Sequence, residues 1–91
     1  MSRITWDREK ERPNLAKHGV AFYEAASVLR QTLSRWELDL AHSAEEDRFQ
    51  VTGYSWYGRL LVVTVAERGA TIQIISARRA TKRERHDYED A

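Results

Sequence analysis

The chain has no cysteine, one proline and four glycines among its 91 residues. The absence of cysteine excludes disulfides and thiolate metal sites. The glycines are scattered and form no phosphate-cradling loop. No apolar run approaches the roughly 20 residues that span a bilayer, and the first residues lack the apolar stretch of a signal peptide. We therefore expect a cytoplasmic protein that has no contact with membranes.

Metal ligands are also scarce. The three histidines, His18, His42 and His86, are far apart in the sequence and form no close-spaced pair. We expect no metal site and no cofactor. The length, with 42% hydrophobic and 32% charged residues, is typical of one small globular domain that spans residues 1–91.

Charge is almost balanced, with a formal net charge of +1, but the two signs are separated along the chain. Acidic residues dominate positions 37–50, where Arg48 is the only arginine or lysine. Basic residues dominate positions 68–86, where Glu84 is the only carboxylate. Such asymmetry creates a local positive field that can steer a polyanion. Charge alone favours the simpler interpretation, two solvated faces of opposite sign.

The first half of the chain shows signals for two helices. Asp7 is a good N-cap, and Gly19 is a natural C-cap. Pro13 lies between them, so we expect either a single turn that stops there or a shorter helix over residues 13–18. Apolar residues at 22, 25, 26 and 29 follow the helical period and predict a second helix from about Phe22 to Arg30.

The second half alternates with the period of strands. Strands are expected over residues 35–40, 48–53, 60–66 and 71–77, with a short first strand over residues 3–6. Thr81 and Glu84 form a capping-box pattern that starts a final helix near Lys82. That helix has almost no apolar residue besides Tyr88, so we expect it to be loose. The fold class is α+β, a small antiparallel sheet with the N-terminal helices packed on one side and a C-terminal helix.

The strongest functional signal lies at the end of the last strand, over residues 76–83. Lys82 and Arg83 occupy the first helical turn, where the helix dipole disfavours cations. An external phosphate would explain their placement. The competing explanation is neutralisation by Glu84, Asp87 and the acidic tail.

A second signal is the segment from His42 to Arg48. Metal-free RNA cleavage needs a base for the 2′-hydroxyl proton, an acid for the leaving 5′-oxygen and a cation for the phosphorane. His42 or Glu45 can supply the base or acid, and Arg48 or Arg59 the cation. A solvated loop with an ordinary ion pair explains the same residues equally well.

Aromatic residues allow two interpretations. Trp36 and Phe49 are expected in the core. Tyr54, Trp56 and Tyr57 cluster near a turn, where exposed rings bind either nucleobases or a partner protein, with the partner favoured.

Several segments, in their order and spacing over nearly the whole chain, resemble the BrnT toxin family. They are Trp6-Asp7, Lys17-His18-Gly19-Val20 with Phe22 and Glu24-Ala25, His42-Ser43 with Glu45 or Glu46 and Arg48, residues 58–62, residues 74–78 with Ala80, and Glu84-Arg85 with Tyr88. The chain departs from the family pattern at Ala21, where a small polar cap is usual, and at Gln73, where a basic residue is common.

This resemblance implies a RelE-like fold and a metal-independent endoribonuclease that arrests growth. It also implies a BrnA-like antitoxin as the partner, with operator DNA bound only through the toxin–antitoxin complex. The site residues would be Arg59 and Arg78 with Arg48 as phosphate ligands, and His42 or Glu45 as acid or base. RNA-backbone contacts are expected from Lys17, His18, Arg79, Lys82, Arg83 and Arg85, although helix capping explains Lys17 and His18 equally well. A non-catalytic partner-binding subunit and a plain nucleic-acid binder remain the alternatives.

Overall fold

The computed structural model of the chain describes residues 3–42 and 46–90. Its elements in chain order are β1 (Arg3–Trp6), α1 (Arg8–His18), α2 (Phe22–Leu29), β2 (Arg35–Leu38), the 3-10 turn η1 (Leu40–His42), β3 (Asp47–Tyr54), β4 (Leu60–Arg68), β5 (Thr71–Arg79) and α3 (Lys82–Glu89). The strands form one five-stranded sheet in the order β1-β5-β4-β3-β2. The α+β class is confirmed.

The expected antiparallel sheet is wrong in one respect, because the sheet is mixed. Strands β2 to β5 follow one another as antiparallel neighbours, but β1 pairs with β5 in parallel, with Ile4 opposite Ile72 and Trp6 opposite Ile74. Short connections force consecutive strands to alternate in direction. The chain leaves β1 through two helices instead, so no hairpin constrains its direction.

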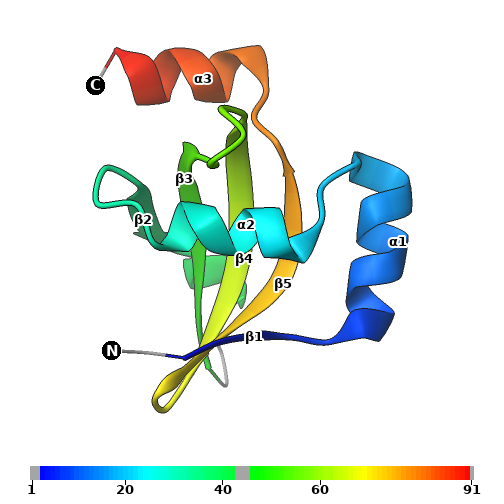
Figure 1. The fold of residues 1–91 in the computed structure, drawn as a ribbon. Helices are drawn as coiled ribbons and strands as arrows, with labels where there is room; N and C mark the ends of the chain where they lie inside the picture. Colours follow the sequence, from blue (N-terminus) through cyan, green and yellow to red (C-terminus); the bar gives the residue numbers. More distant parts are fainter. Residues whose placement is uncertain (1–2, 43–45, 91) are drawn as a thin grey trace.

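One face of the sheet is covered by α2, which crosses it diagonally (Figure 1). Phe22, Ala25 and Val28 of this helix are fully buried against strand residues that include Val63 and Ile74. The expected helix over about Phe22 to Arg30 is confirmed and ends one residue earlier. This layer is the hydrophobic core, since it holds most of the fully buried side chains.

Helix α1 continues through Pro13, contrary to the expected break. Pro13 is exposed, so the Glu9 carbonyl that loses its donor can bind water. Asn14 explains why the helix stays in place. It is buried, and its side-chain amide donates to the Ala77 carbonyl at 2.9 Å and accepts from the Ala77 N–H at 3.1 Å. Strand β1 pairs with β5 only as far as Ile74, so these two bonds give partners to the backbone of β5 beyond the end of β1.

The N-terminus of α2 also depends on α1. Ala21 has no side chain that can cap the helix, and the Glu11 carboxylate accepts from the Phe22 N–H at 2.8 Å instead. A close contact fixes the other end of α2. Gly53 of β3 faces Ser34 so closely that a Cβ there would overlap the Ser34 side chain. The Ser34 hydroxyl donates to the Val28 carbonyl at 2.7 Å, which ties the chain after α2 to its last turn.

The expected half-buried strand over residues 35–40 is shorter and more exposed. Strand β2 ends at Leu38, and Leu40 lies in η1 with 81% of its surface exposed. Trp36 is not a core residue, since it is 40% exposed and packs edge-to-face on Phe49. The strand is at the free edge of the sheet, and α2 does not extend over it.

The helices do not all lie on one side. Tyr54 and Arg78 sit opposite Leu60 and Val62 of β4, so they project from the face that α2 does not cover, and both contact α3. Helix α3 therefore lies at the end of the opposite face (Figure 1). It starts at Lys82 with the expected capping box and has no buried residue.

Polar and ring contacts hold α3, and the sequence did not reveal them. The Tyr88 hydroxyl donates to the Leu33 carbonyl at 2.9 Å, and its ring packs against Tyr54 and under the Arg35 guanidinium. No helix of the described residues is long and apolar enough to cross a membrane.

Candidate functional site

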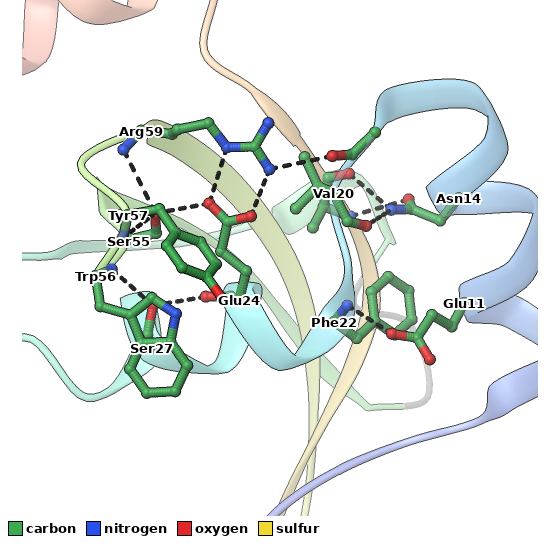
Figure 2. A network of polar contacts seen from close by, with 12 residues as sticks. Glu11, Asn14, Val20, Phe22, Glu24, Ser27, Ser55, Trp56, Tyr57 and Arg59 are labelled. Carbon is green, nitrogen blue, oxygen red and sulfur yellow. Dashed lines mark hydrogen bonds and ion pairs between the residues drawn. The ribbon is translucent and has the colours of Figure 1, made fainter.

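Arg59 is joined to the core by a buried carboxylate (Figure 2). Its Nε donates to Glu24 Oε2 at 2.9 Å, its Nη2 donates to Glu24 Oε1, and the same Nη2 donates to the Gly19 carbonyl at 3.1 Å. Glu24 is 3% exposed. The hydrogen bonds from Arg59 lower the pKa of Glu24 and outweigh the effect of burial, which acts in the other direction.

The same carboxylate organises the β3–β4 turn. The Ser55 hydroxyl donates to Glu24 Oε2 at 2.7 Å and accepts from the Tyr57 N–H at 3.2 Å. The Ser27 hydroxyl donates to the Glu24 carbonyl at 2.6 Å and accepts from the Trp56 N–H at 3.1 Å. Figure 2 shows that these groups converge on Glu24 from α2 and from the turn. Arg59 thus has a structural role that its position in the sequence did not indicate.

Arg78 lies on the other face of the sheet. Its Nη1 and Nη2 donate to the two carboxylate oxygens of Glu84 at 2.7 and 2.9 Å. The hydrogen bonds from Arg78, together with the capping bond from Thr81, lower the pKa of Glu84 to about 2. The guanidinium has five N–H donors, so this pairing leaves others for a further anion.

Arg48 lies on the same face of the sheet as Arg78, but the two side chains are far apart. It lies opposite Ala66 of β4, whereas Arg78 lies opposite Val62, which separates them by roughly 13 Å along the strand. Its Nη2 is 3.8 Å from Glu46 Oε1. The structure therefore brings Arg48 and Arg78 onto one face and places Arg59 on the other, so the three cannot contact one phosphate.

The expected acid and base cannot be placed. Glu45 lies outside the described residues, and so does the side chain of His42, although its backbone belongs to η1. The Asp39 N–H donates to the Arg48 carbonyl at 2.7 Å, which joins the chain before η1 to the start of β3. The roles of His42 and Glu45 as acid or base stay predictions.

Several of the expected RNA-binding cations belong to the last turn of α1, the end of β5 or the first turn of α3. Arg79 lies opposite Leu61 on the α2 face, and it also acts electrostatically on Glu24. Gly19, which contacts Arg59, places the end of α1 beside this position. We name this group the cationic rim: Lys17, His18, Arg79, Lys82 and Arg83.

Charge neutralisation at the rim is incomplete. Arg78 pairs with Glu84, and Arg85 lies 3.8 Å from Glu89, as the competing explanation requires. Among the described residues, no carboxylate lies within ion-pair distance of any member of the cationic rim. The rim therefore retains positive charge for an external anion.

Glu24 and Tyr23 were not predicted as site residues. In the sequence, this acidic and aromatic pair stands beside the apolar stripe of α2. A carboxylate that is buried there needs a cationic partner. Sequence spacing alone cannot identify that partner, because Arg59 is 35 residues away. Among the described residues, no three His, Cys, Asp or Glu side chains form a group suited to a metal ion.

Comparisons with known proteins agree on one family. Residues 6–84 match the family model described as a ribonuclease toxin, BrnT, of a type II toxin–antitoxin system. The chain is also similar to the ribonuclease toxin BrnT of Brucella abortus, known from a 1.1 Å crystal structure. The identity is 25% and the TM-score 0.71, over 90% of this chain and 100% of that one. No curated protein sequence matches the chain.

Proposed function

Because this chain belongs to the BrnT family of ribonuclease toxins from type II toxin–antitoxin systems, we propose that it cleaves RNA without a metal ion and arrests growth when its antitoxin is absent. The observation that carries the proposal within the chain is the pair of arginines, Arg48 and Arg78, on the sheet face that α2 leaves free. The cationic rim, part of which follows the end of β5, supports it.

The chemistry is an internal transfer. The RNA 2′-oxygen forms a bond to phosphorus, and the bond from phosphorus to the 5′-oxygen breaks, which leaves a 2′,3′-cyclic phosphate and a 5′-hydroxyl. A base takes the 2′ proton, and an acid gives a proton to the 5′-oxygen. Negative charge on the phosphorane is stabilised by fixed cations.

We assign Arg78 as the principal phosphate ligand. Its side chain is 35% exposed, and its orientation is fixed by Glu84. A guanidinium that is already oriented loses less entropy when it binds phosphate. Arg48 contacts the neighbouring part of the backbone, and His42 or Glu45 serves as acid or base. Arg59 acts through Glu24 and the turn, as a positioning residue.

RNA approaches across the cationic rim, with Arg85 beside it on α3. Lys82 and Arg83 oppose the helix dipole in the first turn of α3, and an RNA phosphate would relieve that conflict. Steering by this field makes association sensitive to salt.

A BrnA-like antitoxin is the proposed partner, and operator DNA is bound only through the complex. One surface favours a protein partner. Trp36 and Leu38 are exposed on the free edge strand β2, and Leu33 and Leu40 flank it with more than four-fifths of their surfaces exposed. An edge strand with exposed apolar side chains is a site for a partner protein. The same surface supports the second candidate function, a non-catalytic binding subunit.

The test is induction of this chain in a bacterial host, beside cleavage of RNA by the purified protein in EDTA. We expect growth arrest and cleavage from the wild type, and loss of both in Arg78→Ala. Arg12→Ala removes an exposed arginine of α1 and is the matched control. Glu84→Gln weakens the hold on Arg78 and α3 but keeps the cation and a capping side chain. It should therefore cleave less than the wild type and more than Arg78→Ala.

Two results would contradict the proposal. Strict dependence on an added divalent ion would refute metal independence. Intact RNA and normal growth with a soluble, folded protein would favour the binding subunit instead.

A further inference from the structure

Three aromatic rings lie in a row on the outside of the molecule, apart from Arg48 and Arg78. Tyr23 of α2 packs against Trp56, with ring centroids 5.0 Å apart, and Trp56 packs against Tyr57 at 6.2 Å. Their exposed fractions are 60%, 50% and 71%. We name Tyr23, Trp56 and Tyr57 the ring ladder.

The ring ladder stands on a rigid base. The backbone N–H groups of Trp56 and Tyr57 both donate to buried serines, Ser27 and Ser55, as Figure 2 shows. Ser55 in turn donates to the buried Glu24 carboxylate. A buried charge and two buried hydroxyls are costly unless their partners are fixed. This chain meets that cost at the turn that holds Trp56 and Tyr57 in water.

Cations flank the ring ladder on both sides. Arg30 lies on the same face of α2 as Tyr23 and Ser27, at the spacing of i, i+4 and i+7. On the other side Arg59 contacts Gly19, which joins the turn to the cationic rim. Rings between positive charges match the alternation of bases and phosphates in a nucleic-acid strand.

We propose that the ring ladder binds unstacked bases of single-stranded RNA while Arg30 and the cationic rim hold its phosphates. The inference rests on the proposed ribonuclease function and adds a base-binding surface to it. The rings are inclined by 66° and 73° to one another. Bases bound on them cannot stay stacked on each other, so the surface suits splayed single strands and rejects duplexes.

A second exposed apolar surface, at the edge strand β2, differs in kind. It is mainly aliphatic, with Leu33, Leu38 and Leu40, and its single ring, Trp36, packs on Phe49. Glu37 and Asp39 lie among these residues, and acidic side chains repel RNA phosphates. The edge of β2 therefore suits a protein, and the ring ladder, with its cations, suits RNA.

The experiment measures Kd by fluorescence anisotropy for two short single-stranded probes. One is a 2′-O-methyl oligoribonucleotide, which resists cleavage because its 2′-oxygen cannot attack. The other is an abasic oligonucleotide with the same number of phosphates. We expect the wild type to bind the base-bearing probe about tenfold more tightly, the usual gain from base stacking on aromatic side chains.

The ratio of the Kd for the abasic probe to the Kd for the base-bearing probe should fall toward one in Trp56→Ala and in Tyr57→Ala. It should fall less in Tyr23→Ala. Trp36→Ala removes a tryptophan of similar exposure from the edge of β2 and should leave the ratio unchanged. Thermal melting checks that each variant folds. For a duplex probe, the Kd should be the same in the wild type and in the ring-ladder variants.

Unchanged ratios in the ring-ladder variants would overturn the proposal. Unchanged ratios together with lost neutralisation by the antitoxin would assign the rings to the protein partner, which overturns it as well. The proposed function fails separately. If the protein cleaves RNA and Trp56→Ala does not change its preference for base-bearing RNA, the proposed function stands and the ring ladder is refuted. If the ring ladder binds bases but the protein cleaves no RNA, the ring ladder stands and the proposed function is refuted.

Discussion

Helices α2 and α3 are each eight residues long, and they are stabilised in opposite ways. In α2 six residues are buried, among them a carboxylate, and no side chain of its own caps its N-terminus. In α3 no residue is buried, and a complete capping box starts the helix. The first belongs to the core, and the second is held by hydrogen bonds, rings and ion pairs at the surface.

This difference has consequences for stability and for function. Losing α2 exposes the core, so it unfolds only with the whole domain, whereas α3 can detach at a smaller cost. The Glu24 network makes the turn with the ring ladder rigid. Arg78, by contrast, is oriented by an element that can open.

Phe22→Ala should lower the free energy of unfolding by about 3–5 kcal/mol, because the ring is fully buried and leaves a cavity. Urea denaturation measures the loss. Tyr23→Ala, the neighbouring exposed ring, should cost less than about 1 kcal/mol. Equal costs would mean that α2 does not pack as described.

Glu24→Gln should cost about 2 kcal/mol, since it leaves Arg59 without its counter-charge, although partial exposure of Arg59 lowers the penalty. Glu37→Gln on the exposed strand β2 is the control and should be nearly neutral. The pKa of Glu24 is lowered in the folded chain. Its contribution is therefore present above the usual pKa of 4.5 and is lost at lower pH, as acid denaturation of wild type and variant can show.

Thr81→Ala should cost about 1 kcal/mol and act only on α3, because it removes the N-cap. Hydrogen exchange should be faster over residues 82–90 and unchanged in β4. Thr32→Ala, at an exposed turn, is the matched control. Faster exchange throughout the sheet would show that α3 is part of the core unit.

Acidification should release α3 before the core unfolds. The folded pKa of Glu84 is about 2 against 4.5 when unpaired, so its contribution is present above pH 4.5 and disappears as the pH falls toward 2. The effect is the smallest, because both partners are about one-third exposed and water screens them. NMR titration of α3 amides tests it, and Glu84→Gln should abolish the transition. A transition that persists in that variant would assign it to another carboxylate.

Local patterns predicted most of the elements. The helical period at 22, 25, 26 and 29, the capping box at Thr81 and the four later strands were all found within a few residues. The break at Pro13 was wrong, because Asn14 holds α1 on the edge of β5 through contacts 63 residues apart. The RelE-like relationship stays a prediction.

The sequence offered Arg48, Arg59 and Arg78 as candidate site residues, but it could not say how they are arranged. Strand register places Arg48 and Arg78 on one face, and the bonds to Glu24 and Gly19 hold Arg59 on the α2 side. Whether they act in catalysis stays a prediction. The sequence grouped Trp56 and Tyr57 with Tyr54 and favoured a protein partner for them. In the structure Tyr54 packs on Tyr88, and the ring that joins Trp56 is Tyr23 of a distant helix.

The period of most elements, their caps and the separation of charge can be deduced from the chain alone, because they depend on residues within a few positions of one another. The parallel pairing of β1, the burial of Glu24 beside Arg59 and the face on which each arginine lies became clear only in the folded chain. Those outcomes depend on which distant segments meet. A one-residue change in the register of β3 or β5 would move Arg48 or Arg78, respectively, to the other side of the sheet.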